Sequence, residues 1–237
     1  MKKDIFIKNI LVSAIVVLGF AATGFPALVE KNVSYEHNGK QLEGYLVWDD
    51  SLTEKRPGVL VVHEWWGLNE YARSRARRLA ELGYVAFALD MYGKGKSTKH
   101  PEEAEKWMKQ VNQNVETWRA RALAGLQVLK NAKHTDSDRL AAIGYCFGGS
   151  TVQQMAYSGA GLKGVVSFHG SLIEPPEQAS GMVKAAVLIS HGAADPFAPR
   201  QKVYSYLDAM NGSGLDWQMI FYGGAKHSFT NPEADEK

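Results

Sequence analysis

The sequence predicts an α/β fold: a mostly parallel central sheet with helices on both faces, preceded by an antiparallel hairpin at the N-terminal end. Short apolar runs alternate with amphipathic helical patterns along most of the chain, and an Asn-Gly turn joins the first two strand-like runs. No repeat and no linker to a second domain interrupts the series. The 237 residues are 45% hydrophobic and 22% charged, which is ordinary for a globular protein. We therefore expect one domain over residues 28–237.

The hairpin is predicted from the runs 33–35 and 42–48, which flank His-Asn-Gly-Lys. Asn38 and Gly39 both tolerate a positive φ, as a two-residue hairpin turn requires. Beyond the hairpin, continuously apolar runs predict buried strands at 58–63, 84–89, 140–144, 164–168, 185–190 and 217–222. Helical patterns predict helices at 69–82, 101–111, 115–130, 148–156 and 199–210.

Residues 1–27 resemble a secretory signal peptide rather than part of the fold. Lys2, Lys3 and Lys8 precede an apolar run at 10–20, which small residues follow. The run is shorter than the roughly 20 residues of a membrane span, and an uncleaved N-terminal anchor is the alternative. Without the leader's three lysines and one aspartate, the formal net charge falls from +2 to zero. We therefore expect a periplasmic or secreted protein that binds no nucleic acid and, once processed, is not stably associated with a membrane.

The strand at 140–144 runs into Gly-Tyr-Cys-Phe-Gly-Gly, a Gly-x-nucleophile-x-Gly pattern centred on Cys146. The pattern makes a tight strand-to-helix turn, and Gly144 and Gly148 lack side chains that would clash there. The N-terminus of the following helix favours negative charge on the sulfur. A lone cysteine is usually a small buried apolar residue, but its neighbours here predict a nucleophile.

Such a nucleophile needs a carboxylate and a histidine, in the chain order nucleophile, acid, histidine. Asp195 follows the strand 185–190, and His227 lies in the loop after the strand 217–222. Because the carboxyl ends of parallel strands meet at one edge of a sheet, both groups are expected beside Cys146.

Glu64 ends the strand 58–63 and opens a Trp-Trp-Gly-Leu-Asn loop. This loop is expected to provide one oxyanion-hole N–H from Trp65, and Phe147, just after the nucleophile, provides the other. Each of these two N–H groups would stabilise a tetrahedral oxyanion by about 3 kcal/mol. A plain surface carboxylate is the alternative role for Glu64.

From residue 33 to about residue 231 the chain resembles the dienelactone hydrolase family of the α/β-hydrolase superfamily. The matching pieces are Glu-x-x-Gly-Leu-Asn at Glu64, Leu-Asp-Met-Tyr ending at Tyr92, Gly-Tyr-Cys-Phe-Gly-Gly at Cys146, His-Gly-x-x-Asp-Pro at Asp195 and Gly-x-x-His-Ser-Phe at His227. The resemblance implies the α/β-hydrolase fold and a Cys-His-Asp triad that cleaves a small-molecule carboxylic ester or enol lactone through an acyl thioester, without cofactor or metal.

The resemblance also implies that Glu64 pairs with the resting thiol and swings away when substrate binds. Tyr92, Lys94, Ser228 and Phe229 are the implied substrate-binding residues. Members that cleave dienelactones hold the substrate carboxylate with two arginines, whereas this chain has Lys94 and Asn231 at those places. Lysine keeps the charge but loses the bidentate fork, and asparagine keeps neither, so the identity of the ester or lactone stays open.

The chain also ends ten residues after His227, where members of the family usually continue into a final helix. We expect that helix to be missing and the apolar sheet surface beneath it to be exposed, which predicts low stability or a partner. We otherwise expect a monomer.

Several other interpretations fit parts of the sequence. A broad-specificity carboxylesterase or thioesterase uses the same scaffold, and a non-catalytic hydrolase-fold binding module is a further alternative. A thiol redox protein would need a resolving cysteine, which the sequence lacks. The Gly-x-Gly-x-x-Gly match at 159–164 precedes a strand instead of following one, which indicates a loop. His63 and His169 follow apolar strands and are expected to be packed or hydrogen-bonded rather than metal ligands.

Overall fold

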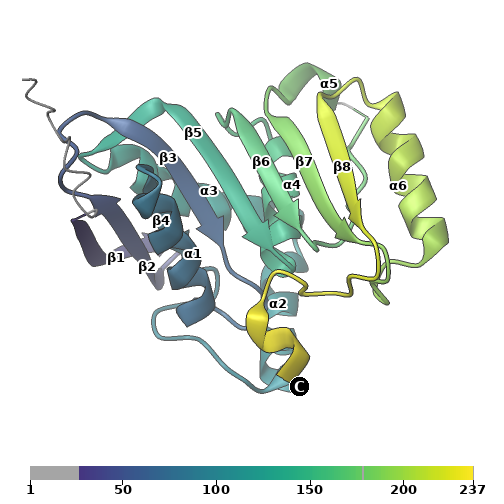
Figure 1. The fold of residues 1–237 in the computed structure, drawn as a ribbon, viewed down its shortest axis with the longest axis horizontal. Coiled ribbons are helices and arrows are strands. Elements are labelled where there is room, and N and C mark those ends of the chain that lie inside the picture. Colours follow the sequence, from purple (N-terminus) through teal and green to yellow (C-terminus); the bar gives the residue numbers. More distant parts are fainter. Residues whose placement is uncertain (1–26, 178, 237) are drawn as a thin grey trace, which may run out of the picture.

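The computed structural model describes residues 27–177 and 179–236 and contains one eight-stranded sheet flanked by helices (Figure 1). The strands are β1 (Leu28–His37), β2 (Lys40–Asp49), β3 (Arg56–Val62), β4 (Val85–Leu89), β5 (Thr135–Tyr145), β6 (Gly164–Phe168), β7 (Ala186–Gly192) and β8 (Trp217–Tyr222). The helices are α1 (Glu70–Glu81), α2 (Pro101–Asn112), α3 (Val115–Asn131), α4 (Phe147–Tyr157), α5 (Ala179–Met182) and α6 (Arg200–Gly212), followed by the 3-10 helix η1 (Pro232–Glu236).

The strand order in the sheet is β1-β2-β4-β3-β5-β6-β7-β8. β1 and β2 form the antiparallel hairpin, β2 joins β4 in antiparallel fashion, and every pair from β4 to β8 in this order is parallel. The carboxyl ends of β3 to β8 therefore lie along one edge of the sheet, which we call the carboxyl edge. The predicted fold class is confirmed.

Helices cover the two faces of the sheet unequally (Figure 1). α1 packs on one face over β2, β3 and β4, where its Ala76 and Ala80 lie against Val61 and Ala88. The other face carries α3, α4 and α6, which enclose the larger core cluster. None of the helices in the described part of the chain combines the length and apolar character needed to cross a membrane.

On the face that carries α1, no helix among the described residues covers β6 to β8 (Figure 1). Ile220 and Tyr222 of β8 are 43% and 39% exposed there. A shallow hollow of about 320 Å³ on this part of the sheet is lined by Ile143, Val166 and Leu188 among others. The predicted exposure of apolar sheet surface is therefore present in the described residues.

The predicted elements are found, with differences at their ends. Asn38 and Gly39 form the hairpin turn with φ of 51° and 72°, and both hairpin strands extend beyond the predicted runs. β5 starts at Thr135, five residues earlier than predicted, because its polar first residues pair with the start of β3 before a register shift. The four-residue α5 was not predicted. The predicted signal peptide, except for Ala27, lies outside the described residues.

Candidate active site

Cys146 stands in the turn between β5 and α4, at the carboxyl edge of the sheet. Its backbone has a φ of 52°, which is unusual for a residue with a side chain. A Cβ on Gly144 would lie 2.0 Å from the carbonyl oxygen of Gly148, and a Cβ on Gly148 would lie 2.2 Å from that of Val62. The turn therefore requires both glycines, as the sequence pattern predicts, and it presents the cysteine side chain at the N-terminus of α4.

His227 and Asp195 come together from the loops after β8 and β7. The distance from His227 Nδ1 to Asp195 Oδ2 is 2.8 Å, and Asp195 is only 8% exposed. The other Asp195 oxygen accepts a hydrogen bond from the Phe197 N–H at 2.9 Å. Phe197 also places its ring edge-on against the His227 ring, with centroids 5.0 Å apart. The carboxylate thus fixes the orientation of the imidazole, and the predicted acid–histidine pair is present.

The surroundings of the thiol favour its neutral form. Burial first, and then the nearby carboxylates of Glu64 and Asp195, raise the pKa of Cys146 to about 12. The backbone N–H groups of Phe147 and Trp65 act on the sulfur in the opposite sense and lower the pKa. Two N–H donors that approach the thiol from different loops are what an oxyanion hole requires.

Among the described residues, no direct hydrogen bond joins the thiol to the His227 ring. The His169 ring connects the two, since its Nδ1 accepts from the Cys146 N–H at 3.1 Å and its centroid lies 5.2 Å from that of His227. The structure therefore brings Cys146, His227 and Asp195 to one edge of the sheet, where the raised pKa of Cys146 favours the neutral thiol.

Glu64 is buried rather than a surface carboxylate, with 2% of its surface exposed. One carboxylate oxygen accepts a hydrogen bond from Ser228 Oγ at 3.0 Å, and the other accepts from Asn231 Nδ2 at 3.1 Å. The loop that carries His227 therefore also holds the carboxylate that influences the thiol. Asn231, which stands where an arginine is expected, is a partner of Glu64.

The predicted substrate-binding residues Tyr92, Lys94 and Phe229 have different surroundings in the structure. Tyr92 is buried, stacks on Phe147 with centroids 5.7 Å apart, and has a hydroxyl without a partner among the described residues. Burial and then the charge of Cys146 raise the pKa of Tyr92, which indicates that the two side chains are close. Lys94 is mostly exposed and forms an ion pair with Glu43 at 2.9 Å. Phe229 packs edge-on against His169 at 5.4 Å.

Asp90 is a further structural residue at this edge, and the sequence gives its motif but not its role. Its Oδ1 accepts hydrogen bonds from the N–H groups of Tyr92 and Gly93 at 2.8 and 2.9 Å, and its Oδ2 accepts from that of Glu43 at 3.1 Å. The loop after β4 is thereby fixed to β2. An aspartate two residues before Tyr-Gly is the local signal for such a turn.

His63 and His169 are both buried and hydrogen-bonded, as predicted. His63 Nε2 accepts from the Met91 N–H at 3.2 Å, and burial lowers the pKa of His63. Within the described residues there is no cluster of three or more His, Cys, Asp or Glu side chains that could hold a metal ion.

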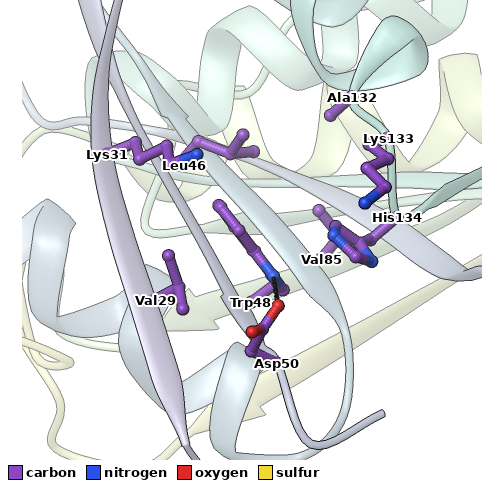
Figure 2. A pocket seen from close by; sticks show the side chains of 9 residues that line it. All are labelled: Val29, Lys31, Leu46, Trp48, Asp50, Val85, Ala132, Lys133 and His134. Atoms are coloured by element: carbon purple, nitrogen blue, oxygen red, sulfur yellow. Dashed lines mark hydrogen bonds between the residues drawn. The ribbon is translucent and has the colours of Figure 1, made fainter. Parts of the chain in front are cut away.

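A hollow on the described surface lies at the opposite end of the parallel strands, and Figure 2 shows the residues that line it. It measures about 390 Å³ and is lined by Val29, Lys31, Leu46, Trp48, Asp50, Val85, Ala132, Lys133 and His134. The Trp48 ring lines it, stacked on His134 with centroids 5.3 Å apart and with Lys31 Nζ 5.1 Å from the ring centroid. We call this hollow the Trp48 cleft; no predicted site residue lines it.

Comparison with known proteins identifies a family and similar solved structures. A sequence profile of the dienelactone hydrolase family matches residues 42–237. Protein usf of Aquifex pyrophilus is 28% identical over 212 residues, which cover 86% of this chain and 88% of that protein. The solved structure of the dienelactone hydrolase-like promiscuous phosphotriesterase P91, from metagenomic libraries, is 36% identical with a TM-score of 0.84, covering 89% of this chain and 87% of that one. The solved structure m3DLH is 41% identical, also with a TM-score of 0.84, over 88% and 87% of the two chains.

Proposed function

The chain belongs to the dienelactone hydrolase family and is a carboxylic ester hydrolase, and from that premise we propose that Cys146, His227 and Asp195 are its catalytic triad. One observation carries the proposal: Cys146 stands at a positive φ in the turn before α4, at the same edge of the sheet as a histidine that a buried aspartate orients at 2.8 Å. A nucleophile, a base and a group that orients the base are the parts that acyl transfer through a covalent intermediate requires.

In the first step the thiol proton passes to His227 and the thiolate attacks the acyl carbonyl. Movement of the Glu64 carboxylate away from the sulfur promotes this ionisation, because its negative charge raises the pKa of the thiol. The carbon–oxygen bond of the ester then breaks, the acyl group stays on sulfur as a thioester, and the leaving alkoxide or enolate takes the proton from His227. The N–H groups of Trp65 and Phe147 stabilise the oxyanion.

In the second step His227 removes a proton from water, which attacks the thioester. The carbon–sulfur bond breaks, the acid product leaves, and the proton returns to the thiolate. Thiolate is a good leaving group, so the enzyme favours esters with good leaving groups over amides.

The substrate class follows from the two positions that lack arginine. Lys94 is paired with Glu43, and Asn231 with Glu64, so neither supplies a fork for a substrate carboxylate. We therefore favour an uncharged enol lactone or activated ester, bound beside Tyr92, Ser228 and Phe229. A broad-specificity carboxylesterase or thioesterase is the alternative. The protein is proposed to act as a monomer in the periplasm or outside the cell, after removal of residues 1–27.

The test is hydrolysis of a panel containing an uncharged enol lactone, a carboxylate-bearing dienelactone, p-nitrophenyl acetate, an acyl thioester and an aryl phosphotriester. We expect the uncharged lactone and the aryl ester to have the highest kcat/KM. Replacement of Cys146 by Ala should abolish turnover of every carboxylic ester, at constant fold by circular dichroism. Turnover by the Cys146→Ala variant near the wild-type rate would overturn the proposal. Preference for the carboxylate-bearing lactone would overturn the substrate class alone.

A further inference from the structure

His169 is a completely buried histidine that the proposed chemistry does not use. It follows β6 directly, and its φ of 42° turns the backbone sharply at the carboxyl edge. Both ring nitrogens have partners: Nδ1 lies 3.1 Å from the Cys146 backbone nitrogen, and Nε2 lies 2.7 Å from Thr230 Oγ1. One imidazole therefore connects the turn that carries the nucleophile with the loop that carries His227.

The direction of these hydrogen bonds follows from chemistry. A backbone N–H can only donate, so Nδ1 of His169 must be the unprotonated nitrogen, and the ring proton is on Nε2. Nε2 then donates to Thr230 Oγ1, and the Thr230 hydroxyl is also hydrogen-bonded to Tyr71 Oη at 2.8 Å. Burial and the neighbouring His227 lower the pKa of His169 to about 3, in agreement with a neutral ring.

The far end of this chain of hydrogen bonds is attached to α1. Tyr71 belongs to α1, and Arg75, one turn later, lies over the Tyr71 ring at 4.8 Å. Arg75 also donates a hydrogen bond to the Thr230 carbonyl oxygen. The backbone and the side chain of Thr230 are thus both held by α1, three residues after His227.

The same loop holds the groups that the reaction needs. His227 contacts the His169 ring edge-on at 5.2 Å, and Ser228 and Asn231 bind the two oxygens of Glu64. A shift of this loop relative to the nucleophile turn would change the approach of the imidazole to the sulfur and the position of Glu64 together.

We propose that His169 is a positioning residue that sets the placement of the His227 loop relative to Cys146 through its hydrogen bonds to the Cys146 N–H and to Thr230. The proposal rests on the proposed triad. The Cys146 N–H also donates to the Phe168 carbonyl oxygen at 3.0 Å, so loss of the His169 acceptor leaves no unsatisfied N–H in the turn. Substitution of His169 therefore affects placement more than folding.

Three variants test separately the hydrogen bonds made by the two nitrogens of the His169 ring. His169→Asn keeps an acceptor near the Nδ1 position and tolerates the positive φ, but does not reach Thr230. His169→Gln extends an amide donor toward Thr230 but offers no acceptor at the Nδ1 position. Thr230→Val removes only the hydroxyl and keeps the shape. His134→Asn, at the Trp48 cleft, is the matched control for loss of an imidazole elsewhere.

We expect each of the three variants to lower kcat on p-nitrophenyl acetate by about 10- to 100-fold with KM changed less than about threefold, because misplacement of about 1 Å costs up to about 100-fold. His169→Asn combined with Thr230→Val should be no slower than the worse single variant, because both remove the hydrogen bond between His169 and Thr230. The control should retain the wild-type kcat.

Values of kcat within twofold of wild type for His169→Asn, His169→Gln and Thr230→Val would overturn the proposal. The proposal would also be overturned if the losses of kcat multiplied in the double variant. The same holds if the variants lowered the melting temperature and left kcat unchanged. If a His169 variant does not fold, the Thr230→Val variant decides through its kcat and its melting temperature. The proposed triad is tested apart from this, because its failure would appear as full turnover in Cys146→Ala, whatever the His169 variants do.

Discussion

The two edges of the sheet are built in contrasting ways. The Trp48 cleft at one edge is a hollow of about 390 Å³, yet none of its lining residues has a positive φ. At the carboxyl edge, three of the four non-glycine residues with a positive φ in the described chain come together: Cys146, His169 and Ser228. Conformations of this kind cost free energy and persist only where the surrounding structure holds them in place.

A hollow in the surface is therefore a poor guide to the candidate active site in this protein. In the Trp48 cleft the polar groups serve packing, since the indole N–H of Trp48 donates to Asp50 at 3.1 Å and its ring lies between Lys31 and His134 (Figure 2). At the carboxyl edge the polar groups from distant segments converge on one thiol. Substitutions at the carboxyl edge should therefore lower activity with little change in stability. Substitutions in the Trp48 cleft should lower stability with little change in activity.

The largest effect is expected from Asp195→Asn. The amide cannot hold His227 in the tautomer and charge state that acyl transfer needs, so kcat should fall by about 10³- to 10⁴-fold while the melting temperature changes little. Steady-state kinetics with p-nitrophenyl acetate measure this. Asp208→Asn, on the exposed side of α6, is the control and should be fully active. A kcat within tenfold of wild type for Asp195→Asn would assign the acid to another residue.

Trp48→Ala should show the reverse behaviour. Removal of this ring, which is 7% exposed, should lower the free energy of unfolding by about 3 kcal/mol. Activity per folded molecule should not change, because no predicted catalytic group lines the cleft. Urea unfolding and kinetics well below the transition measure the two quantities, and Lys31→Met is the control, with an expected loss below about 1 kcal/mol. A loss of activity larger than the unfolded fraction would mean that the cleft takes part in function.

A smaller effect is expected from Glu64→Gln. Burial and the Glu64 charge hold the pKa of Cys146 up, at about 12, so little thiolate exists at pH 7 and alkylation by iodoacetamide should accelerate as the pH rises toward that value. Removal of the negative charge lowers the pKa and increases the thiolate fraction, so alkylation at pH 7 should become about tenfold faster. Glu43→Gln, which changes only the partner of Lys94, should react like wild type. Slower alkylation of Glu64→Gln would show that the carboxylate promotes ionisation instead.

Much of the fold could be predicted because it is encoded locally. Apolar runs mark β3, β4, β6, β7 and β8, and the Asn-Gly turn marks the hairpin. The polar start of β5 escaped prediction because it depends on pairing with β3 and not on its own pattern. α5 is too short for any periodicity to show.

The residues of the candidate site also differ in whether the sequence alone indicates them. Cys146, Asp195 and His227 follow strands and stand in recognisable motifs, so the chain itself indicates them. The partners of the supporting residues are far away in sequence: Thr230 is 61 residues from His169, and Asn231 is 167 residues from Glu64. Only the folded chain shows these contacts, and it also shows that Lys94 is committed to Glu43.

The most direct test of the central claim is the site of acylation. Wild-type protein that is turning over a p-nitrophenyl ester is quenched in acid, digested and analysed by mass spectrometry. We predict one acyl group, on the peptide containing Cys146, that hydroxylamine removes as expected for a thioester. An acyl group on a different side chain, or steady turnover with no acyl group on Cys146 at any quench time, would contradict it.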